Sequence, residues 1–536
     1  MALTGDTRLR RILAAGYFPE ELPPPFVTAD LSSYRKFLLQ NLPTADREKF
    51  TSEYEGFSFP RYGRARRRLA IINPINMLVI GKEISDNWGG IRKHLKKSAI
   101  SEFKPIFDLK GRRALFGVDF DKVEEKINDI LARYRNCVKT DISRFYGTIY
   151  THSIPWALYG KSYCKKNHSQ PKFKQSLGDR LDKFVRNSQS QQSIGIPVGP
   201  DFSRIIAEII AVELDAGLNK LLNATSRRAV RYVDDIAVGY TQEENDDVIV
   251  SQIAKVLGEF ELEVNLDKTH VLGVGRPLTP EWRHTIRRFR LSSDVRRQRA
   301  DLEAYFKEAL YLSELSPKDN VLDYALKRST SLQIDPSNWA YYENFLLRIS
   351  RMNSTTVPVV CQILIDRNSK GLPVDIGKVK SYIIDIIRQH LPMGHVGEIS
   401  WCLFLLKGLN IAVKSKELRE IYALDSSVCA LIVLDLFTRG LISGAPKLDQ
   451  WKLWTNSEGL KSTMWLLAYE SILKGWLPKS KPCYIESDPF FKFLLQKKIS
   501  FYNTKKNVVS LEKWSAATIS KKSMIKHVFG HLDQYF

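Results

Sequence analysis

The sequence lacks the features that mark several large classes of protein. Its six cysteines are scattered and include no Cys-x-x-Cys pair, which argues against both a disulfide framework and a zinc site. No apolar run approaches the roughly 20 residues of a membrane span. Pro19, Glu20 and Glu21 interrupt the N-terminal segment before it reaches the apolar length of a signal peptide. We therefore expect a soluble protein of a reducing compartment, without a membrane association.

The sequence is long and carries a large excess of positive charge. The 81 lysines and arginines exceed the 59 aspartates and glutamates by 22. Such an excess is typical of proteins that bind a polyanion, either nucleic acid or an anionic membrane surface. With 44% apolar and 26% charged residues, the composition is globular rather than disordered. The 536 residues predict about two to four domains, at roughly 100–200 residues each.

The pattern of the chain changes near residue 295. Before it, short strand-like runs alternate with amphipathic helices, and these runs are residues 68–72, 136–141, 229–240 and 264–274. After it the pattern is almost wholly helical, as in a solenoid or an irregular bundle. Residues 283–299 join the two parts and hold seven arginines, which form either a solvated helix face or a track for nucleic acid. We expect an α+β domain at 1–290 and an all-helical domain at 291–536.

The most informative run is Arg231-Tyr-Val-Asp-Asp-Ile-Ala-Val-Gly-Tyr240, in which Asp234 and Asp235 interrupt an apolar, β-prone segment. Because successive strand residues face opposite sides of a sheet, two adjacent carboxylates fit best at a tight hairpin, where both can point roughly the same way. A buried ionised carboxylate needs a cation or a hydrogen-bond donor to compensate it. The run therefore predicts a metal site.

A third carboxylate lies in Lys139-Thr-Asp-Ile-Ser-Arg-Phe-Tyr-Gly-Thr-Ile149, where Asp141 ends a strand-like segment. Three aspartates from two strands would provide the hard oxygen ligands that Mg²⁺ takes together with substrate phosphates. Two such ions, about 3.5–4 Å apart, would activate an attacking oxygen and stabilise a leaving pyrophosphate. Each run alone is also common in ordinary turns, but the two together favour the metal site.

These two runs resemble the palm motifs of reverse transcriptases. More narrowly, they are similar to those of bacterial antiviral reverse transcriptases of the abortive-infection group, the AbiK-like and P2-prophage-like enzymes and their defence-associated relatives. The resemblance extends over most of residues 10–300 and includes Gly195-Ile-Pro-Val-Gly-Pro-Asp-Phe-Ser-Arg204 and Leu266-Asp-Lys-Thr269. It implies a fingers-and-palm domain at 1–290 and, in place of a thumb, an all-α HEAT-like helical-repeat domain at 291–536. It also implies a DNA polymerase that uses dNTPs and two Mg²⁺ ions, with Mn²⁺ as a substitute.

The resemblance assigns roles to single residues of the predicted metal site. Asp141 and Asp234 would bridge the metal ions, with Asp235 as the third carboxylate ligand and the carbonyl of Ile142 as a further one. Tyr146 would be the aromatic gate that stacks against the sugar and excludes a 2′-OH, which predicts deoxynucleotide substrates. The alternative for Tyr146 is ordinary packing in the core.

Basic residues and a glycine-rich loop complete the predicted nucleotide site. Guanidinium groups match triphosphate oxygens in bidentate geometry, and the resemblance implies that Arg66 and Arg67 bind the incoming nucleotide; a surface cluster on backbone phosphates is the alternative. Gly199 would let the backbone approach the substrate closely, and Asp201 would cap the helix that follows. By resemblance Lys268 lies near the leaving pyrophosphate, as a general acid or as a solvated loop lysine.

Val198 departs from the family pattern, because reverse transcriptases that copy templates usually have glutamine at this position. The change removes a hydrogen-bonding side chain beside the nucleotide and puts templated fidelity in doubt. Relatives in the antiviral group share this kind of departure, and some extend DNA from a protein primer without a template. Protein priming would need a tyrosine hydroxyl near Asp141, and the sequence singles out none of its 22 tyrosines.

His390, His395 and Glu398 form a second cluster of interest in the helical part. Two histidines and a carboxylate could belong to another active site, such as a nuclease, or could make hydrogen bonds between packed helices. We expect the second, because no further Cys, His or Asp cluster accompanies them.

The resemblance implies a cytoplasmic bacterial enzyme of phage defence that acts by abortive infection. It would polymerise dNTPs from a protein primer without a template and leave single-stranded DNA attached to itself. By resemblance it forms a closed homo-oligomer, a trimer or a hexamer. Two alternatives stay open: a templated, RNA-copying reverse transcriptase of the retron or group II intron type, and a catalytically silent nucleic-acid-binding scaffold. The three aspartates favour an enzyme over the scaffold.

Overall fold

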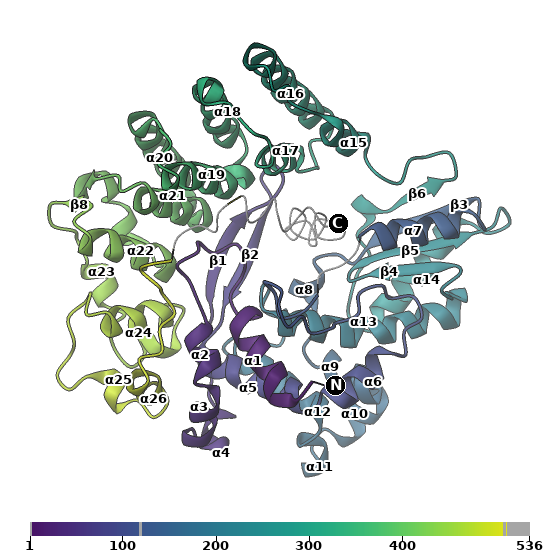
Figure 1. The fold of residues 1–536 in the computed structure, drawn as a ribbon. Coiled ribbons are helices and arrows are strands. Elements are labelled where there is room, and N and C mark those ends of the chain that lie inside the picture. The colour runs from purple at the N-terminus through teal and green to yellow at the C-terminus, as the bar shows by residue number, and fades with distance from the viewer. Residues whose placement is uncertain (1–2, 117–119, 507–510, 512–536) are drawn as a thin grey trace.

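The computed structural model describes residues 3–116, 120–506 and 511. In the view of Figure 1, the N-terminal helices lie at the bottom, the β1–β2 hairpin at the centre and a four-stranded sheet at the right. The helices from α15 onward return across the top and down the left side to the N-terminal helices. Among the described residues, no helix has both the length and the hydropathy that a membrane crossing requires.

The first part of the chain is helical except for one hairpin. Its elements are α1 (Gly5–Ala15), α2 (Ala29–Ser33), α3 (Arg35–Asn41), α4 (Thr44–Arg47), β1 (Glu55–Pro60), β2 (Arg66–Ile71), α5 (Pro74–Asp86), α6 (Trp88–Leu95) and α7 (Phe120–Leu131). β1 and β2 pair antiparallel, and β2 begins two residues before the predicted strand. Asn73 ends the hairpin and starts α5, since its side chain accepts a hydrogen bond from the Ile75 N–H, with Pro74 in the first helical position.

The middle part contains the four-stranded sheet. Its elements are β3 (Asn136–Asp141), α8 (Phe145–Thr148), α9 (Ser153–Tyr159), α10 (Lys161–Asn167), α11 (Pro171–Lys174), α12 (Leu177–Asn187), α13 (Asp201–Leu222), β4 (Ala229–Tyr232), β5 (Asp235–Tyr240), α14 (Asp246–Gly258) and β6 (His270–Gly273). The strands follow the order β4-β5-β3-β6, and every neighbouring pair is antiparallel. The predicted strands at 136–141 and 229–240 are confirmed. The one at 264–274 is shorter, because a 3₁₀ turn precedes β6.

The two faces of this sheet pack differently. Cys137 and Ala237 point into a small apolar cluster with Ile130 of α7, whereas Val138 and Ile236 belong to the main core, which also contains side chains of α13 and α14. Side chains alternate along a strand, so Asp141 and Asp235 lie on the face that carries α7.

The prediction that Asp201 caps α13 is wrong. Pro200 is the capping residue, and Asp201 is the first residue inside the helix. Its buried carboxylate instead accepts hydrogen bonds from the Ala114 N–H at 2.9 Å and from Arg113 Nε at 3.1 Å. A carboxylate in the first turn also interacts favourably with the helix dipole, so Asp201 attaches the segment before α7 to this helix.

The second part consists almost entirely of helices. They are α15 (Glu281–Arg288), α16 (Val295–Leu315), α17 (Val321–Ser329), α18 (Trp339–Met352), α19 (Val357–Ser369), α20 (Ile376–His390), α21 (Val396–Gly408), α22 (Ser427–Thr438), α23 (Asp449–Lys452), α24 (Trp465–Leu473), α25 (Tyr484–Ser487) and α26 (Phe491–Gln496). The prediction of an all-helical part is wrong at one place, where β7 (Val413–Lys414) and β8 (Ile442–Ser443) form a short parallel pair.

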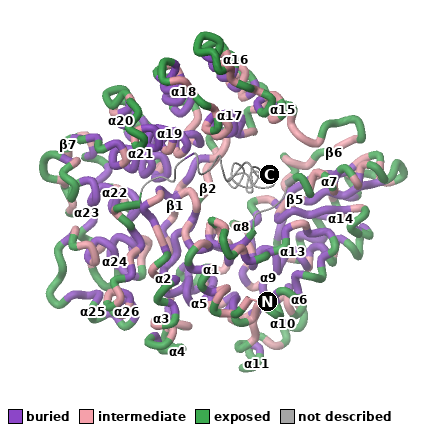
Figure 2. The backbone as a smooth tube through the Cα atoms, viewed as in Figure 1, coloured by how far each residue is buried: buried purple, intermediate pink, exposed green. Residues whose placement is uncertain are grey.

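Buried contacts join the second part to the β1–β2 hairpin and to the N-terminal helices. One main core contains side chains from both predicted domains. In Figure 2 the buried segments of the hairpin lie next to buried segments of the helices in the second part. The indole of Trp465 donates to the Ile71 carbonyl at 3.0 Å, and the Asn73 amide donates to the Leu460 carbonyl at 2.9 Å. The predicted boundary at residue 290 is therefore crossed by a shared core. All six cysteines are free and buried.

Glu55 is a buried acid at this junction. Its carboxylate accepts hydrogen bonds from Ser426 Oγ at 3.2 Å and from the Val428 N–H at 3.4 Å, at the beginning of α22. A helix N-terminus favours a negative charge. Burial nevertheless outweighs these contacts and raises the pKa of Glu55 to about 7.

We expect Glu55→Gln to stabilise the protein at pH 8 and to leave its stability at pH 5 nearly unchanged. Between the ordinary glutamate pKa of 4.5 and about 7, the folded state binds more protons than the unfolded chain, so wild-type stability falls as the pH rises. The glutamine variant lacks this proton and should be more stable by about 1–3 kcal/mol at pH 8 in chemical denaturation. Glu53→Gln, at an exposed neighbour, is the control, and identical pH profiles for both variants would contradict this account.

Candidate active site

Asp234 and Asp235 lie at the turn between β4 and β5. β4 ends at Tyr232 and β5 begins at Asp235, so the chain reverses within two residues. Val233 adopts the left-handed conformation at φ +52°, which is unfavourable for a β-branched residue. Strain of this kind costs about 1–3 kcal/mol and clusters at functional sites. The predicted tight hairpin is confirmed.

The pairing of β3 with β5 brings Asp141 to the same place. Asp141 and Asp235 are direct partners across the two strands, and the Ile142 N–H donates to the Asp234 carbonyl at 3.1 Å. Directly opposite residues have their Cβ atoms about 4.5–5.5 Å apart and point to the same face. The structure therefore gathers the three predicted carboxylates at one end of two neighbouring strands.

The charges in this cluster are poorly compensated. Burial raises the pKa of Asp234, and the nearby charges of Asp235 and Asp141 raise it further. Burial also raises the pKa of Asp235, against the opposing charge of Lys139. Asp141 Oδ1 is buried and has no hydrogen-bond partner among the described residues. Three repelling carboxylates with an unsatisfied oxygen fit divalent cations, and their hard oxygens suit Mg²⁺.

Lys268 lies within the cluster. It ends the 3₁₀ turn Leu266–Lys268, and its ammonium forms an ion pair with Asp141 Oδ2. The side chain is one third exposed, so it reaches the carboxylate from the solvent side. The structure thus brings Lys268 into the site as a counter-ion of Asp141.

Tyr146 lies beside the carboxylates on α8. It is half-buried, and its carbonyl accepts a hydrogen bond from the Ile196 N–H at 2.8 Å. Burial raises the pKa of its hydroxyl, and the charges of Arg204, Asp234 and Arg67 also act on it. Tyr146 is therefore near the predicted metal ligands, in a position compatible with the expected gate.

The loop at residues 195–200 connects the hairpin with the sheet. The Val198 carbonyl accepts a hydrogen bond from the Ala70 N–H at 2.8 Å, and the Gly199 carbonyl accepts one from Arg113 Nη2 at 2.8 Å. Gly199 has φ +119°, and a Cβ there would lie 2.9 Å from Cγ of Pro19. Only glycine fits this position, which holds the loop against the N-terminal segment and leaves Val198 half-buried.

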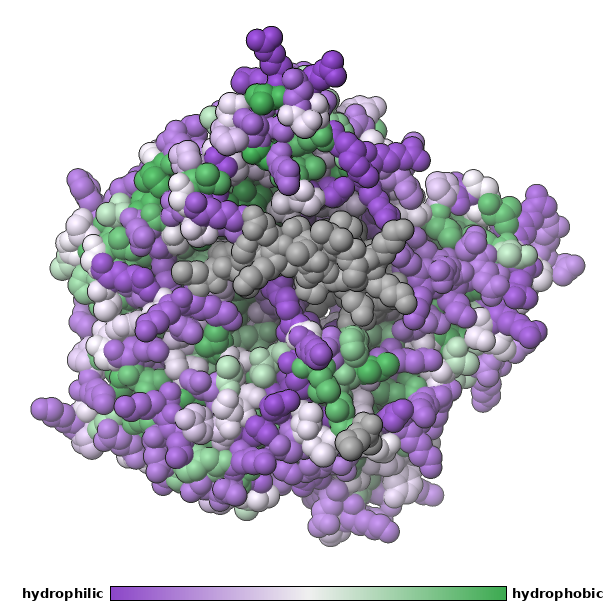
Figure 3. Space-filling view, viewed as in Figure 1, coloured by the Kyte–Doolittle hydropathy of each residue, from purple (hydrophilic) through white to green (hydrophobic). Residues whose placement is uncertain are grey.

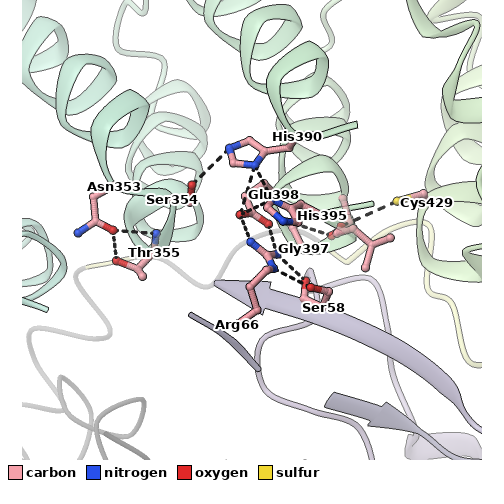
Figure 4. A network of polar contacts seen from close by, with 12 residues as sticks. Ser58, Arg66, Asn353, Ser354, Thr355, His390, His395, Gly397, Glu398 and Cys429 are labelled. Atoms are coloured by element: carbon pink, nitrogen blue, oxygen red, sulfur yellow. Dashed lines mark hydrogen bonds and ion pairs between the residues drawn. The ribbon is translucent and has the colours of Figure 1, made fainter. Parts of the chain in front are cut away.

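Arg66 and Arg67 have different surroundings, because successive residues of β2 face opposite sides. The Arg66 guanidinium donates to both carboxylate oxygens of Glu398 at 2.7 Å each and to Ser58 Oγ at 2.7 Å (Figure 4). The donors of Arg66 are thus used at the junction with α21, and its binding of nucleotide stays a prediction. Arg67 lies on the other side, where its charge lowers the pKa of Tyr146 against the effect of burial.

Two basic residues near the carboxylates were missed in the sequence. Arg61, just before the tip of the hairpin, is close enough for its charge to lower the pKa of Asp235. Lys139 has a stronger effect of the same sign and lies two residues before Asp141 on the same strand face. Strand alternation could have identified Lys139. Without the structure, the sequence does not distinguish Arg61 from the other arginines that follow it closely in the chain.

Comparison with known proteins identifies the middle of the chain. Residues 77–288 match the family model described as reverse transcriptase (RNA-dependent DNA polymerase). The segment from α5 to α15 is therefore a reverse transcriptase domain, which makes the chain an enzyme, an RNA-directed DNA polymerase and nucleotidyltransferase. No curated protein matches the chain.

Two telomerases are among the solved structures similar to this chain. The apo telomerase from Candida tropicalis is 11% identical with a TM-score of 0.31, and the match covers 74% of this chain and 71% of the telomerase. The telomerase from Candida albicans, solved in complex with the TWJ fragment of telomeric RNA, is 12% identical with a TM-score of 0.27, over 75% of this chain and 68% of that one.

We expect Asp234→Asn to stabilise the metal-free protein and to remove its stabilisation by divalent ions. The amide relieves the repulsion among the carboxylates, which should add about 1 kcal/mol of unfolding free energy in chelator at pH 8. Mg²⁺ or Mn²⁺ should raise the unfolding midpoint of the wild type, because a ligand of the folded state stabilises it, but not that of the variant. Asp267→Asn, at an exposed neighbour of Lys268, is the control in thermal melts. Equal stabilisation of both variants by the ions would contradict the site.

Proposed function

We propose that this reverse transcriptase domain synthesises DNA from dNTPs with two Mg²⁺ ions, from a protein primer and without a template, in the defence of a bacterium against phage. The convergence of Asp141, Asp234 and Asp235 is the observation that carries the polymerase chemistry. When bound, the two ions would activate the attacking hydroxyl and stabilise the leaving pyrophosphate. In the proposal Asp141, Asp234 and Asp235, together with the Ile142 carbonyl, would hold the ions. Mn²⁺ is the expected substitute.

Residues around the carboxylates support the handling of a triphosphate. Arg67 and Arg61 bring positive charge to this side of the hairpin, and Lys268 reaches Asp141 from the exposed side. In the proposal Arg67 would bind the triphosphate, and Lys268 would lie near the leaving pyrophosphate, where its ammonium could act as a general acid. Phosphoryl transfer depends chiefly on such positioning and charge stabilisation. Tyr146 is the proposed gate against ribonucleotides.

The loop at 195–200 supports synthesis without a template. Val198 is anchored through its backbone carbonyl to β2, and its apolar side chain offers no hydrogen bond to a base or sugar. The resemblance to antiviral reverse transcriptases, which motivates the defence role, also suggests protein priming, a cytoplasmic location, a trimer or hexamer, and a HEAT-like arrangement of the helices from α15 onward.

The joining stretch at 283–299 supports contact with a nucleic-acid strand. Six of its seven arginines are exposed on α15, on α16 and in the connection between them, and hydrophilic side chains dominate the top of the molecule in Figure 3. Exposed arginines contact phosphates irrespective of base sequence. We propose that this surface follows the growing single strand.

The product of the purified protein tests the proposal. With dNTPs and Mg²⁺ but no added nucleic acid, we expect labelled DNA that migrates with the protein until protease releases it. Asp234→Asn should yield none, and Asp267→Asn should behave as the wild type. Product that follows the sequence of an added primed RNA would instead support a templated enzyme of the retron or intron type. Defence activity retained by Asp234→Asn in cells would support a silent scaffold.

Neighbouring arginines on opposite faces of β2 give a matched test of nucleotide binding. Arg67→Lys should raise the KM for dNTPs about tenfold, because an ammonium does not reproduce the bidentate fork. Arg66→Lys should leave that KM unchanged and lower the thermal midpoint, since it weakens the contact with buried Glu398. Steady-state kinetics and melts of both variants separate the two roles. An unchanged KM in Arg67→Lys would remove Arg67 from the site.

A further inference from the structure

We propose that His390, His395 and Glu398 form a binding site for a divalent transition-metal ion of the zinc class, which fastens α20 and α21 to the β1–β2 hairpin. The site is separate from the three aspartates and does not depend on the proposed function. Its three ligand atoms all lie within 4.8 Å of one another.

The local fold brings the three side chains together. His390 is the last residue of α20, His395 caps the beginning of α21, and Glu398 lies in the first turn of α21. Between the helices, a 3₁₀ turn ends at Gly394 with φ +61°, so the chain reverses and the two imidazoles face each other (Figure 4). Gly397 allows α21 to approach β1, since a Cβ there would lie 2.7 Å from the Ser58 carbonyl oxygen.

The distances between the ligand atoms fit a zinc ion. The two Nδ1 atoms are 2.9 Å apart, and Glu398 Oε1 lies 3.6 Å from Nδ1 of His390 and 3.9 Å from Nδ1 of His395. The point equidistant from the corners of this triangle lies about 2.0 Å from each of them. Zinc binds histidine nitrogen at about 2.0–2.1 Å and carboxylate oxygen at about 2.0–2.2 Å.

Hydrogen bonding alone accounts for only part of this arrangement. One proton can be shared between the two Nδ1 atoms, but Glu398 Oε1 is beyond hydrogen-bond distance of both. Both imidazoles therefore face the Glu398 carboxylate oxygen without forming a hydrogen bond to it.

The neighbours of the three ligands resemble the outer contacts of known metal sites. Ser354 Oγ lies 3.3 Å from Nε2 of His390, which leaves Nδ1 for the ion. Arg66 holds both oxygens of Glu398 at 2.7 Å. Metal-binding histidines and carboxylates are usually oriented by such contacts. Each carboxylate oxygen has two lone pairs, so Oε1 can accept from Arg66 and bind an ion as well.

Burial points to a structural role. The side chains of His390 and Glu398 are 5% and 0% exposed, and that of His395 is 18% exposed. Three protein ligands leave a fourth position for water, but a substrate would have little access. Glu398 would then bind the ion and Arg66 together, so the ion would fix in place the carboxylate through which the helical part contacts the strand that carries Arg67.

Metal analysis of the full chain tests the proposal. Protein purified with a tag that does not bind metals should contain about one zinc per chain by mass spectrometry, and Asp234→Asn should retain it. After a chelator has removed the zinc from Asp234→Asn, in which Mg²⁺ should not raise the unfolding midpoint, the thermal midpoint should fall and recover with Zn²⁺ but not with Mg²⁺. Co²⁺ should give a visible absorption band typical of tetrahedral nitrogen and oxygen coordination.

Two variants provide the comparison. His395→Ala removes the most exposed ligand and should lower the zinc affinity at least tenfold and abolish the Co²⁺ band. His270→Ala, at an exposed histidine in β6, should match the wild type. If His395→Ala does not fold, the zinc content and the Co²⁺ spectrum of the wild type still show whether the site binds metal. Wild-type protein without zinc and without the Co²⁺ band, or zinc retained in His395→Ala, would overturn the proposal.

Discussion

Repulsion among three carboxylates is the constraint around which the sheet is built. The register of β3 with β5 sets Asp141 directly opposite Asp235, and the turn at Val233 adds Asp234 beside them. Like charges at this spacing destabilise a fold unless something compensates them. Lys268 and Lys139 do so only in part, and one oxygen of Asp141 has no hydrogen-bond partner within the described part of the chain. The rest of the domain holds these groups together against that repulsion.

The β1–β2 hairpin connects this site with the helical part. Its two faces carry side chains toward different neighbours. One face carries Arg67 toward Tyr146, while the other presents Arg66 to Glu398. Contacts of Glu55 with α22 and of Trp465 with β2 fix the same hairpin from the helical side. The position of Arg67 therefore depends on helices that are several hundred residues away in the sequence.

The central sheet could be predicted closely, since strand alternation and hairpin chemistry are local properties. The strands at 136–141 and 229–240 and the convergence of the three aspartates follow from those patterns alone. The contact of Arg66 with Glu398 could not be predicted, because the two residues are 332 positions apart and neither segment has a pattern that indicates the other. The same reason explains the His390 cluster: its helix-packing contacts were expected, but the spacing of the three ligand atoms appears only once α20 and α21 fold back on each other.

The core shared by the hairpin and the later helices bears on how such enzymes can diversify or be engineered. A helical half exchanged at residue 290 would leave the indoles of Trp401 and Trp465 without the backbone carbonyls to which they donate. The Leu460 carbonyl would lose the Asn73 side-chain amide. The natural unit of recombination is therefore discontinuous. It comprises the helical half together with the N-terminal segment and the hairpin, while the central sheet with its aspartates is the insert.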